Sequence, residues 1–481
     1  MESSKSLVLK GVFWNAIQLV VNQGFAFIVK LVLAKILLPE QFGLVGMATV
    51  FTGFVSVLTE LGIGAALIQK KEGDLTREHY DTAFWTGIVW SASLYLTMAF
   101  AIAPLAAKFY NEDILKQLIP IISIGILLSP INLVNRAQLS KQMSFKKIAR
   151  IESTSNVVAG IISILLALWG AGVWSLAFNS TAIIVFAIPF YFRATNWFPK
   201  LSWNKKAFKE IFGFGIFTTG TNMINYFVNN VDYLLIGKLL SAQLLGAYAF
   251  AFVLTDTFRS RLMAVINNVM YPLYGKKQSD PAAMKRYYLK VVSYNCVIVF
   301  PTMLLLFLLA EPFILSFFGA KWVNSILPLK ILAVSIMVQM LVNSNTVLIR
   351  ALGRPGLEMK LQLLKAVVYM PALAYGVYKY GIVGASWAVL FSRVFNVLIA
   401  QYTFNYLISV KVTTYELFNE IKGSVLATVF AFIVGSIMLN VLNVNFLIVG
   451  LVVLLVFGLS IYKLMGEELS AHVNFMRSKR T

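Results

Sequence analysis

The residues best suited to chemistry in this chain are polar side chains placed at helical spacing inside strongly apolar segments. In residues 11–37 they fall within an arc of roughly 140° on a helix: Asn15, Gln18, Asn22, Gln23 and Lys30. Residues 210–237 carry an even narrower stripe: Thr218, Asn222, Asn225, Asn229 and Asp232. Amides and hydroxyls arranged in this way can hydrogen-bond a polar solute such as a glycan, and the ammonium group can bind an anion.

Two neighbouring apolar segments repeat the pattern. One carries Thr49, Thr52, Ser56, Thr59 and Glu60, and the other carries Tyr248, Thr255, Asp256 and Arg259. In lipid such side chains must face other helices or water, because an ionised group at mid-bilayer costs on the order of 3 kcal/mol or more. The four stripes therefore predict one shared hydrated cavity. The simpler alternative is that Asn and Thr only join helices, at about 0.6 kcal/mol for each hydrogen bond.

The basic members of these stripes are candidates for binding an anionic headgroup. Lys30 and Arg259 are the first two, and the guanidinium matches phosphate oxygens in a bidentate manner. Asp256 and Arg259 are spaced i, i+3, so they can equally neutralise each other. Arg261 points about 160° away from Arg259 on a helix and is not expected on the same surface. Arg393, in residues 381–408, is a third candidate anion contact.

The acidic members allow two interpretations. Asp232 and Glu60 could couple transport to protons or sodium ions, because a desolvated carboxylate can have its pKa raised toward neutrality. They could also serve as counter-ions to Lys30 or Arg259, as Asp256 could. The sequence leaves both roles open.

The elements that must position these residues are membrane-spanning helices. The chain has a mean hydropathy of +0.78 and only 13% charged residues, which excludes an ordinary soluble protein. Strand-like alternation is absent, so we expect an all-α polytopic membrane protein. About fourteen spans are expected, at residues 11–37, 41–68, 83–107, 114–135, 151–169, 171–192, 210–237, 243–269, 288–310, 326–349, 361–379, 381–408, 423–442 and 445–463.

An internal repeat organises these spans. Leu31–Gly46 (LVLAKILLPEQFGLVG) returns 203 positions later as Leu234–Ala249 (LLIGKLLSAQLLGAYA), with Lys35 on Lys238 and Gly43 on Gly246. We expect a six-helix bundle at 1–202, a second at 203–410, and helices 13 and 14 with a cytoplasmic tail at 411–481. Because six is even, the bundles should be parallel repeats around a central cavity.

The net charge of +21 is explained by topology and not by nucleic acid. Most of the 41 Lys and Arg lie in alternate loops, which places both termini in the cytoplasm and the basic loops near anionic membrane lipid. Cys296 is the single cysteine, and His79 and His472 are far apart in the sequence. No metal-ligand cluster, phosphate loop or nucleophile elbow is present, so we expect no metal, no cofactor and no enzymatic activity.

Two runs of sequence resemble a known family. They are Gly11–Gln69, with AKILLPEQFGLVGMATVF at its centre, and the later run NNVDYLLIGKLLSAQLLGAYAFA. Both are similar to the polysaccharide transporter family, and more narrowly to the Wzx-type lipopolysaccharide and colanic-acid exporters and the teichuronic-acid exporters. These belong to the superfamily that also contains multidrug exporters and lipid II flippases. The similarity extends over the whole chain and is specific for the family but not for the substrate.

The resemblance implies a flippase in the bacterial cytoplasmic membrane. Its substrate would be an oligosaccharide on undecaprenyl pyrophosphate, moved from the inner to the outer leaflet by alternating access, with a polysaccharide polymerase or ligase as a possible partner. The first alternative is a cation-coupled multidrug-type exporter, which would favour a pocket dominated by carboxylates. A membrane polymerase or ligase is the second, but such enzymes would be expected to carry a large catalytic extracytoplasmic loop. A purely structural membrane protein is the third.

Overall fold

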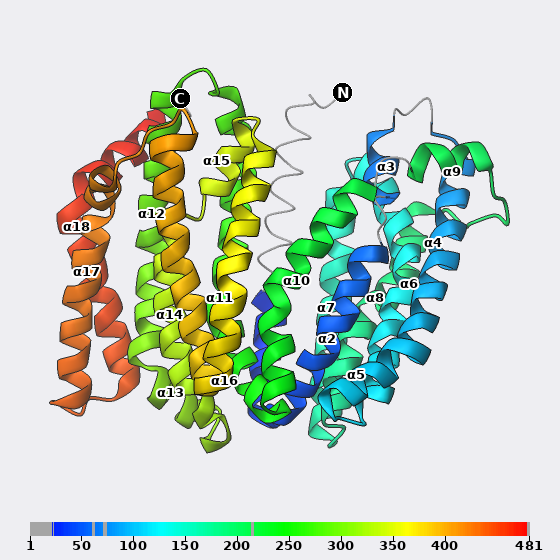
Figure 1. The fold of residues 1–481 in the computed structure, drawn as a ribbon, viewed down its shortest axis with the longest axis horizontal. Coiled ribbons are helices and arrows are strands. Elements are labelled where there is room, and N and C mark those ends of the chain that lie inside the picture. The colour runs from blue at the N-terminus through cyan, green and yellow to red at the C-terminus, as the bar shows by residue number, and fades with distance from the viewer. Residues whose placement is uncertain (1–21, 23, 60–62, 71–74, 213–215, 479–481) are drawn as a thin grey trace. The chain divides into compact units, whose positions relative to one another are not determined.

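The computed structural model describes residues 22, 24–59, 63–70, 75–212 and 216–478, and every regular element in them is helical (Figure 1). The main helices of the first half are α2 (Pro39–Thr59), α3 (Ile63–Gln69), α4 (Arg77–Thr97), α5 (Ala103–Tyr110), α6 (Leu115–Lys141), α7 (Phe145–Leu168), α8 (Val173–Thr195), α9 (Lys205–Phe212) and α10 (Ile216–Leu239). They continue with α11 (Ala242–Lys276), α12 (Pro281–Leu308), α13 (Ala310–Phe317), α14 (Ile326–Met340), α15 (Asn345–Ala351), α16 (Pro355–Tyr402), α17 (Thr414–Asn440) and α18 (Phe446–Ser478).

The expected all-helical membrane architecture is confirmed. Within the described residues, ten helical stretches are long and apolar enough to cross a membrane. One of them, Pro355–Leu407, contains two expected spans, because Gly381 adopts φ 59° and ψ −141° and breaks α16 between 361–379 and 381–408. Helices α10 and α11 overlap the expected spans 210–237 and 243–269, although α10 begins only at Ile216 and α11 continues to Lys276. The total of fourteen stays a prediction.

The chain divides into two compact units, residues 1–249 and 250–481. In the first unit, α8 packs against α6 and α7, α6 packs against α4, and α2 packs against both α6 and α10. The expected boundaries at 202 and 410 were placed from the sequence repeat, whereas these two units are defined by how compactly the chain packs. The expected boundaries therefore stay a prediction.

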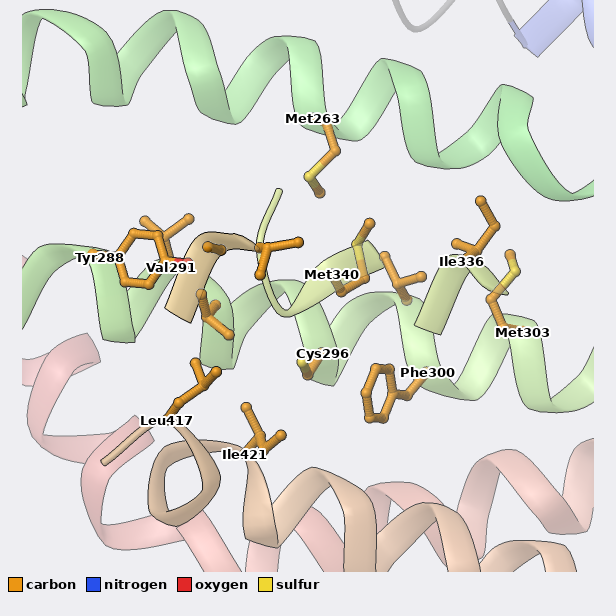
Figure 2. Packing of buried hydrophobic residues seen from close by; sticks show 14 of the residues in the cluster. Met263, Tyr288, Val291, Cys296, Phe300, Met303, Ile336, Met340, Leu417 and Ile421 are labelled. Atoms are coloured by element: carbon orange, nitrogen blue, oxygen red, sulfur yellow. The ribbon is translucent and has the colours of Figure 1, made fainter. Parts of the chain in front are cut away.

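The second unit is built on the buried helix α12. Helices α14 and α17 pack against α12, and α16 covers α14. Figure 2 shows the apolar core at this place, where Cys296 and Phe300 of α12 lie near Met340 of α14 and Ile421 of α17. Cys296 is fully buried there. Helix α17 buries Ala427 and Ala431 but exposes a large apolar side chain such as Phe430, which suits a helix at the lipid boundary.

Candidate substrate-binding and coupling sites

The two copies of the sequence repeat meet in the first unit. Helix α2 begins with Pro39, which suits the first position of a helix, and α11 begins after Ser241, whose Oγ accepts a hydrogen bond from Leu244 N at 3.2 Å. A Cβ added at Gly43 would lie 1.7 Å from Ala242 O. A Cβ added at Gly246 would lie 1.7 Å from Pro39 O. Only glycine at both positions permits this approach.

This contact, here called the glycine crossing (Pro39, Gly43, Ala242 and Gly246), is reciprocal. The repeat offset of 203 converts Pro39 into Ala242 and Gly43 into Gly246. Gly43 of the first copy therefore contacts Ala242 of the second, and Gly246 of the second copy contacts Pro39 of the first. The same pair of repeat positions meets twice, as in an isologous interface. Two copies related by a local two-fold axis would make such a contact, and the parallel arrangement of the two bundles stays a prediction.

Beside the glycine crossing, Asp232 is buried with 3% of its surface exposed. Its Oδ2 accepts a hydrogen bond from the Tyr248 hydroxyl at 2.9 Å, and its Oδ1 accepts one from Tyr233 N at 3.0 Å. At the matched positions of the first copy stand Val29 and Val45. The carboxylate and its phenol partner thus belong to the second copy alone.

The other residues predicted in the polar stripes of this unit are less uniformly placed. Asn22 is buried, and its Oδ1 has no hydrogen-bond partner among the described residues. Asn225 is half-buried, whereas Lys30 and Asn229 are exposed. The side chain of Asn222 and the whole of Glu60 lie outside the described residues, as do Asn15, Gln18 and Gln23.

A residue that the sequence did not single out joins the two stripes. The Tyr226 hydroxyl of α10 donates a hydrogen bond to Thr49 O of α2 at 2.7 Å. It approaches α2 at Gly53, where an added Cβ would lie 2.1 Å from the hydroxyl oxygen. A tyrosine next to Asn225 carries no sequence signal that pairs it with a distant glycine, so only the packing of α10 on α2 reveals the contact.

In the second unit, the predicted pairing of Asp256 with Arg259 is observed. The Arg259 Nη2 lies 2.6 Å from Asp256 Oδ1, and Nε lies 2.7 Å from the same oxygen. The Nη1 of Arg259 also reaches Asn343 Oδ1 at 3.4 Å, a long contact. Arg393, on α16, donates from Nη1 to Gln339 Oε1 of α14 at 2.8 Å. The sequence reasoning missed Gln339 and Asn343, because nothing in their spacing links them to distant arginines.

A third polar cluster of the first unit lies where the end of α3 and the start of α4 meet α9. Glu210 of α9 is paired with Lys70, and its Oε2 lies 3.1 Å from His79 Nε2. The Lys70 and His79 hydrogen bonds hold the pKa of the Glu210 carboxyl at about 2, well below its ordinary value. Nearby, Asp81 Oδ1 accepts from Lys200 N at 3.1 Å, and Thr82 Oγ1 accepts from Asn204 N at 3.0 Å. These two hydrogen bonds hold the segment between α8 and α9 against α4. Over the described part of the chain, no group of acidic, His or Cys side chains has a metal-ligand arrangement.

The fold and these sites define a multi-pass, all-helical membrane protein with an internal repeat. A family model described as polysaccharide biosynthesis protein matches residues 32–327, which is more than half of the chain and includes both copies of the repeat. The chain belongs to this family.

Two curated relatives extend the similarity. The teichuronic acid biosynthesis protein TuaB of Bacillus subtilis (strain 168) is 26% identical over 373 residues, covering 76% of this chain and 75% of the relative. The lipopolysaccharide biosynthesis protein WzxC of Escherichia coli (strain K12) is 27% identical over 413 residues, covering 83% of this chain and 81% of the relative. Both agree with the resemblance found in the sequence.

A solved structure shares the fold. The lipid II flippase MurJ in an inward closed conformation superposes with a TM-score of 0.75 at 14% identity, covering 95% of this chain and all of the other. At this identity the likeness concerns the fold alone.

Proposed function

We propose that this protein is a flippase for the repeat unit of a bacterial surface polysaccharide. It moves an oligosaccharide linked to undecaprenyl pyrophosphate from the inner to the outer leaflet of the cytoplasmic membrane. The observation that carries the proposal is the family match over residues 32–327, because it contains both repeat copies and their glycine crossing. On this proposal the protein is a transporter and not an enzyme.

The proposed contacts with the substrate are the residues predicted from the polar stripes and two arginines. They are the stripe residues and arginines Asn22, Lys30, Asn222, Asn225, Asn229, Arg259 and Arg393. Amides suit the hydroxyls of sugars, and guanidinium and ammonium groups suit the diphosphate. The proposed coupling or counter-ion residues are Glu60, Asp232 and Asp256. The Asp256–Arg259 ion pair favours a counter-ion role for Asp256, whereas the buried Asp232, hydrogen-bonded by Tyr248, is the better candidate for H⁺ or Na⁺ coupling.

The glycine crossing gives a mechanical element for alternating access. On the predicted topology, the turns before α2 and α11 face the outside of the cell. Gly43 and Gly246 then hold the repeat copies together at the outer end of the protein. Outward opening requires this contact to separate, and its separation breaks no ion pair, because Pro39, Gly43, Ala242 and Gly246 carry no charge.

A cation-coupled multidrug-type exporter is the second candidate, and the buried carboxylate of Asp232 favours it. The chemistry of the second unit argues for an anionic substrate, because the partly buried Arg259 and Arg393 both donate to side-chain amide oxygens. We therefore keep the lipid-linked oligosaccharide as the proposed substrate. Both termini are placed in the cytoplasm, and a polysaccharide polymerase or ligase is the proposed partner.

The test is the location of the lipid-linked oligosaccharide in cells depleted of this protein. Undecaprenyl-linked glycans would be extracted, and their leaflet would be probed with a membrane-impermeant glycosidase on intact spheroplasts. We expect an inaccessible intermediate to accumulate in the inner leaflet, and its composition would identify the sugar. An outward-facing pool of normal size, in a strain without a second flippase, would refute the proposal.

A further inference from the structure

One membrane-crossing stretch of the second unit is broken. Helix α14 ends at Met340, residues 341–344 form a turn, and α15 begins at Asn345, all within the candidate span Ala320–Ala351. We call residues 339–345 the α14 break. Non-helical backbone at membrane depth is tolerated where it is buried in protein or lines a polar cavity. One carbonyl at the break, Leu341 O, accepts a hydrogen bond from the Tyr288 hydroxyl at 3.2 Å.

Two arginines from different helices converge on the α14 break. Arg393 of α16 reaches Gln339 at its start, and Arg259 of α11 reaches Asn343 within it. Figure 2 shows Met263, one turn after Arg259, together with Met340 in the same buried cluster, so α11 faces α14 here. Lys365 lies within electrostatic reach of Arg393. Two carboxylates lie near these cations: Asp256 is paired with Arg259, and Glu358, which also interacts with Lys365, is paired with Arg350. Four cations against two carboxylates leave these groups with an excess of positive charge.

The α14 break also holds polar atoms that make no hydrogen bond to the described residues. They are Asn343 Nδ2, Ser344 Oγ and Asn345 Oδ1. The exposed fractions of Ser344 and Asn345 are 0% and 4%, so these are buried groups of a kind that normally has a partner. The Asn343 amide and the Ser344 hydroxyl are both able to donate; Asn343 is the residue that Arg259 reaches, and Ser344 follows it in the chain.

We propose that the α14 break is a binding site for a phosphate-class anion, namely the diphosphate of the lipid-linked substrate. Arg259 and Arg393 supply charge-assisted hydrogen bonds, and Asn343 and Ser344 supply neutral donors. A metal cation is disfavoured, because it would lie beside two guanidinium groups. The amide oxygens of Gln339 and Asn343 hold the arginines while the site is empty and release them at small cost, since each is a neutral acceptor. This inference rests on the proposed function and adds the location of the diphosphate.

The test is binding of undecaprenyl pyrophosphate to the full-length protein in nanodiscs made of uncharged lipid. We expect Arg393→Gln and Ser344→Ala each to weaken binding, by roughly tenfold for the arginine and several-fold for the hydroxyl. Arg136→Gln is the matched control, because Arg136 is an exposed arginine that pairs with Glu152 within the first unit, and this variant should bind as the wild type does. Ser344→Ala removes a single buried oxygen, so it reports on the site even where an arginine variant folds poorly.

The outcomes separate the site from the function. Wild-type binding with unchanged affinity in Arg393→Gln and Ser344→Ala would overturn the site and leave the flippase proposal standing. A folded wild-type protein that binds no undecaprenyl pyrophosphate would overturn both. Competition with phosphatidylglycerol distinguishes the source of the phosphate. Displacement by phosphatidylglycerol at equal concentration would overturn the assignment to the substrate in favour of a lipid headgroup, whereas resistance to it would support the diphosphate.

Discussion

The glycine crossing and the α14 break differ in how closely the chain is packed and in whether polar groups are left without hydrogen bonds. At the crossing, backbone meets backbone so closely that a single added Cβ at Gly43 or Gly246 would lie 1.7 Å from a carbonyl oxygen. At the α14 break the regular helix gives way to a turn, and Asn343 Nδ2 and Ser344 Oγ make no hydrogen bond to the described residues. The difference teaches that a tightly packed contact without charged side chains suits an element that only opens and closes. An incompletely satisfied polar site suits an element that binds.

The largest expected effect comes from filling the crossing. Gly43→Leu should lower the free energy of unfolding by about 3 kcal/mol and abolish transport, because the new side chain would overlap the backbone of Ala242. Thermal unfolding in detergent and export in cells would measure this. Gly46→Ala is the control on the same helix, since its nearest neighbours lie at 3.5 Å, an ordinary contact distance. Equal stability of the two variants would show that the crossing is not tight.

The next largest effect is expected from the arginines at the α14 break. Arg259→Gln should reduce transport by about tenfold, because a charge-assisted contact is lost and Asp256 is left without its partner. Arg261→Gln should have a smaller effect, since the helical phase directs residue 261 away from residue 259. Export rates at matched membrane levels would be compared. Equal losses would argue against the stripe assigned to α11.

A smaller effect is expected from the asymmetry between the repeat copies. Asp232→Asn should slow export several-fold with normal membrane insertion, because the amide keeps the shape but loses the titratable group. The amide oxygen can still accept from Tyr233 N, and the amide nitrogen can donate to the Tyr248 hydroxyl. Tyr248→Phe, which removes the hydroxyl donor and keeps the carboxylate, should be milder. Unchanged export in Asp232→Asn would remove this carboxylate from the coupling mechanism and leave it a structural partner of Tyr248.

The smallest effect is expected at the linker. Glu210 has its pKa held at about 2 by Lys70 and His79, so its contribution to linker docking is present above its ordinary value of 4.5 and is lost as the pH falls toward 2. Docking can be followed by the fluorescence of Trp203, whose Nε1 donates to Thr86 Oγ1 at 3.2 Å, after subtracting the signal of Trp203→Phe. Glu210→Gln should abolish the pH-dependent part of that signal. An unchanged profile would assign the dependence to another group.

Much of the fold could be predicted because the membrane imposes simple rules. Apolar runs of about twenty residues mark helices, and the described helices α2 to α18 follow the predicted spans from 41–68 onward. The position of Gly43 and Gly246 was visible as a repeat. Their reciprocal contact was not, because sequence spacing gives register and not which backbones touch.

The candidate sites were predicted less completely. The i, i+3 pairing of Asp256 with Arg259 follows from helical geometry, and the structure contains it. The partners of Asp232 and Arg393 are Tyr248 and Gln339, which lie 16 and 54 positions away and on other helices. No local rule connects residues at such separations.

The sequence by itself determined the class of protein, its helical character, the repeated segment and the family. These depend on hydropathy and periodicity, which are properties of one helix at a time. The tertiary structure alone decided that the two repeat glycines lie in one close backbone contact and that the Tyr226 hydroxyl of α10 hydrogen-bonds to α2. It also decided that Arg259 and Arg393 both donate to residues of the α14 break. Those features depend on which helix faces are brought together, and many apolar faces are interchangeable until packing selects among them.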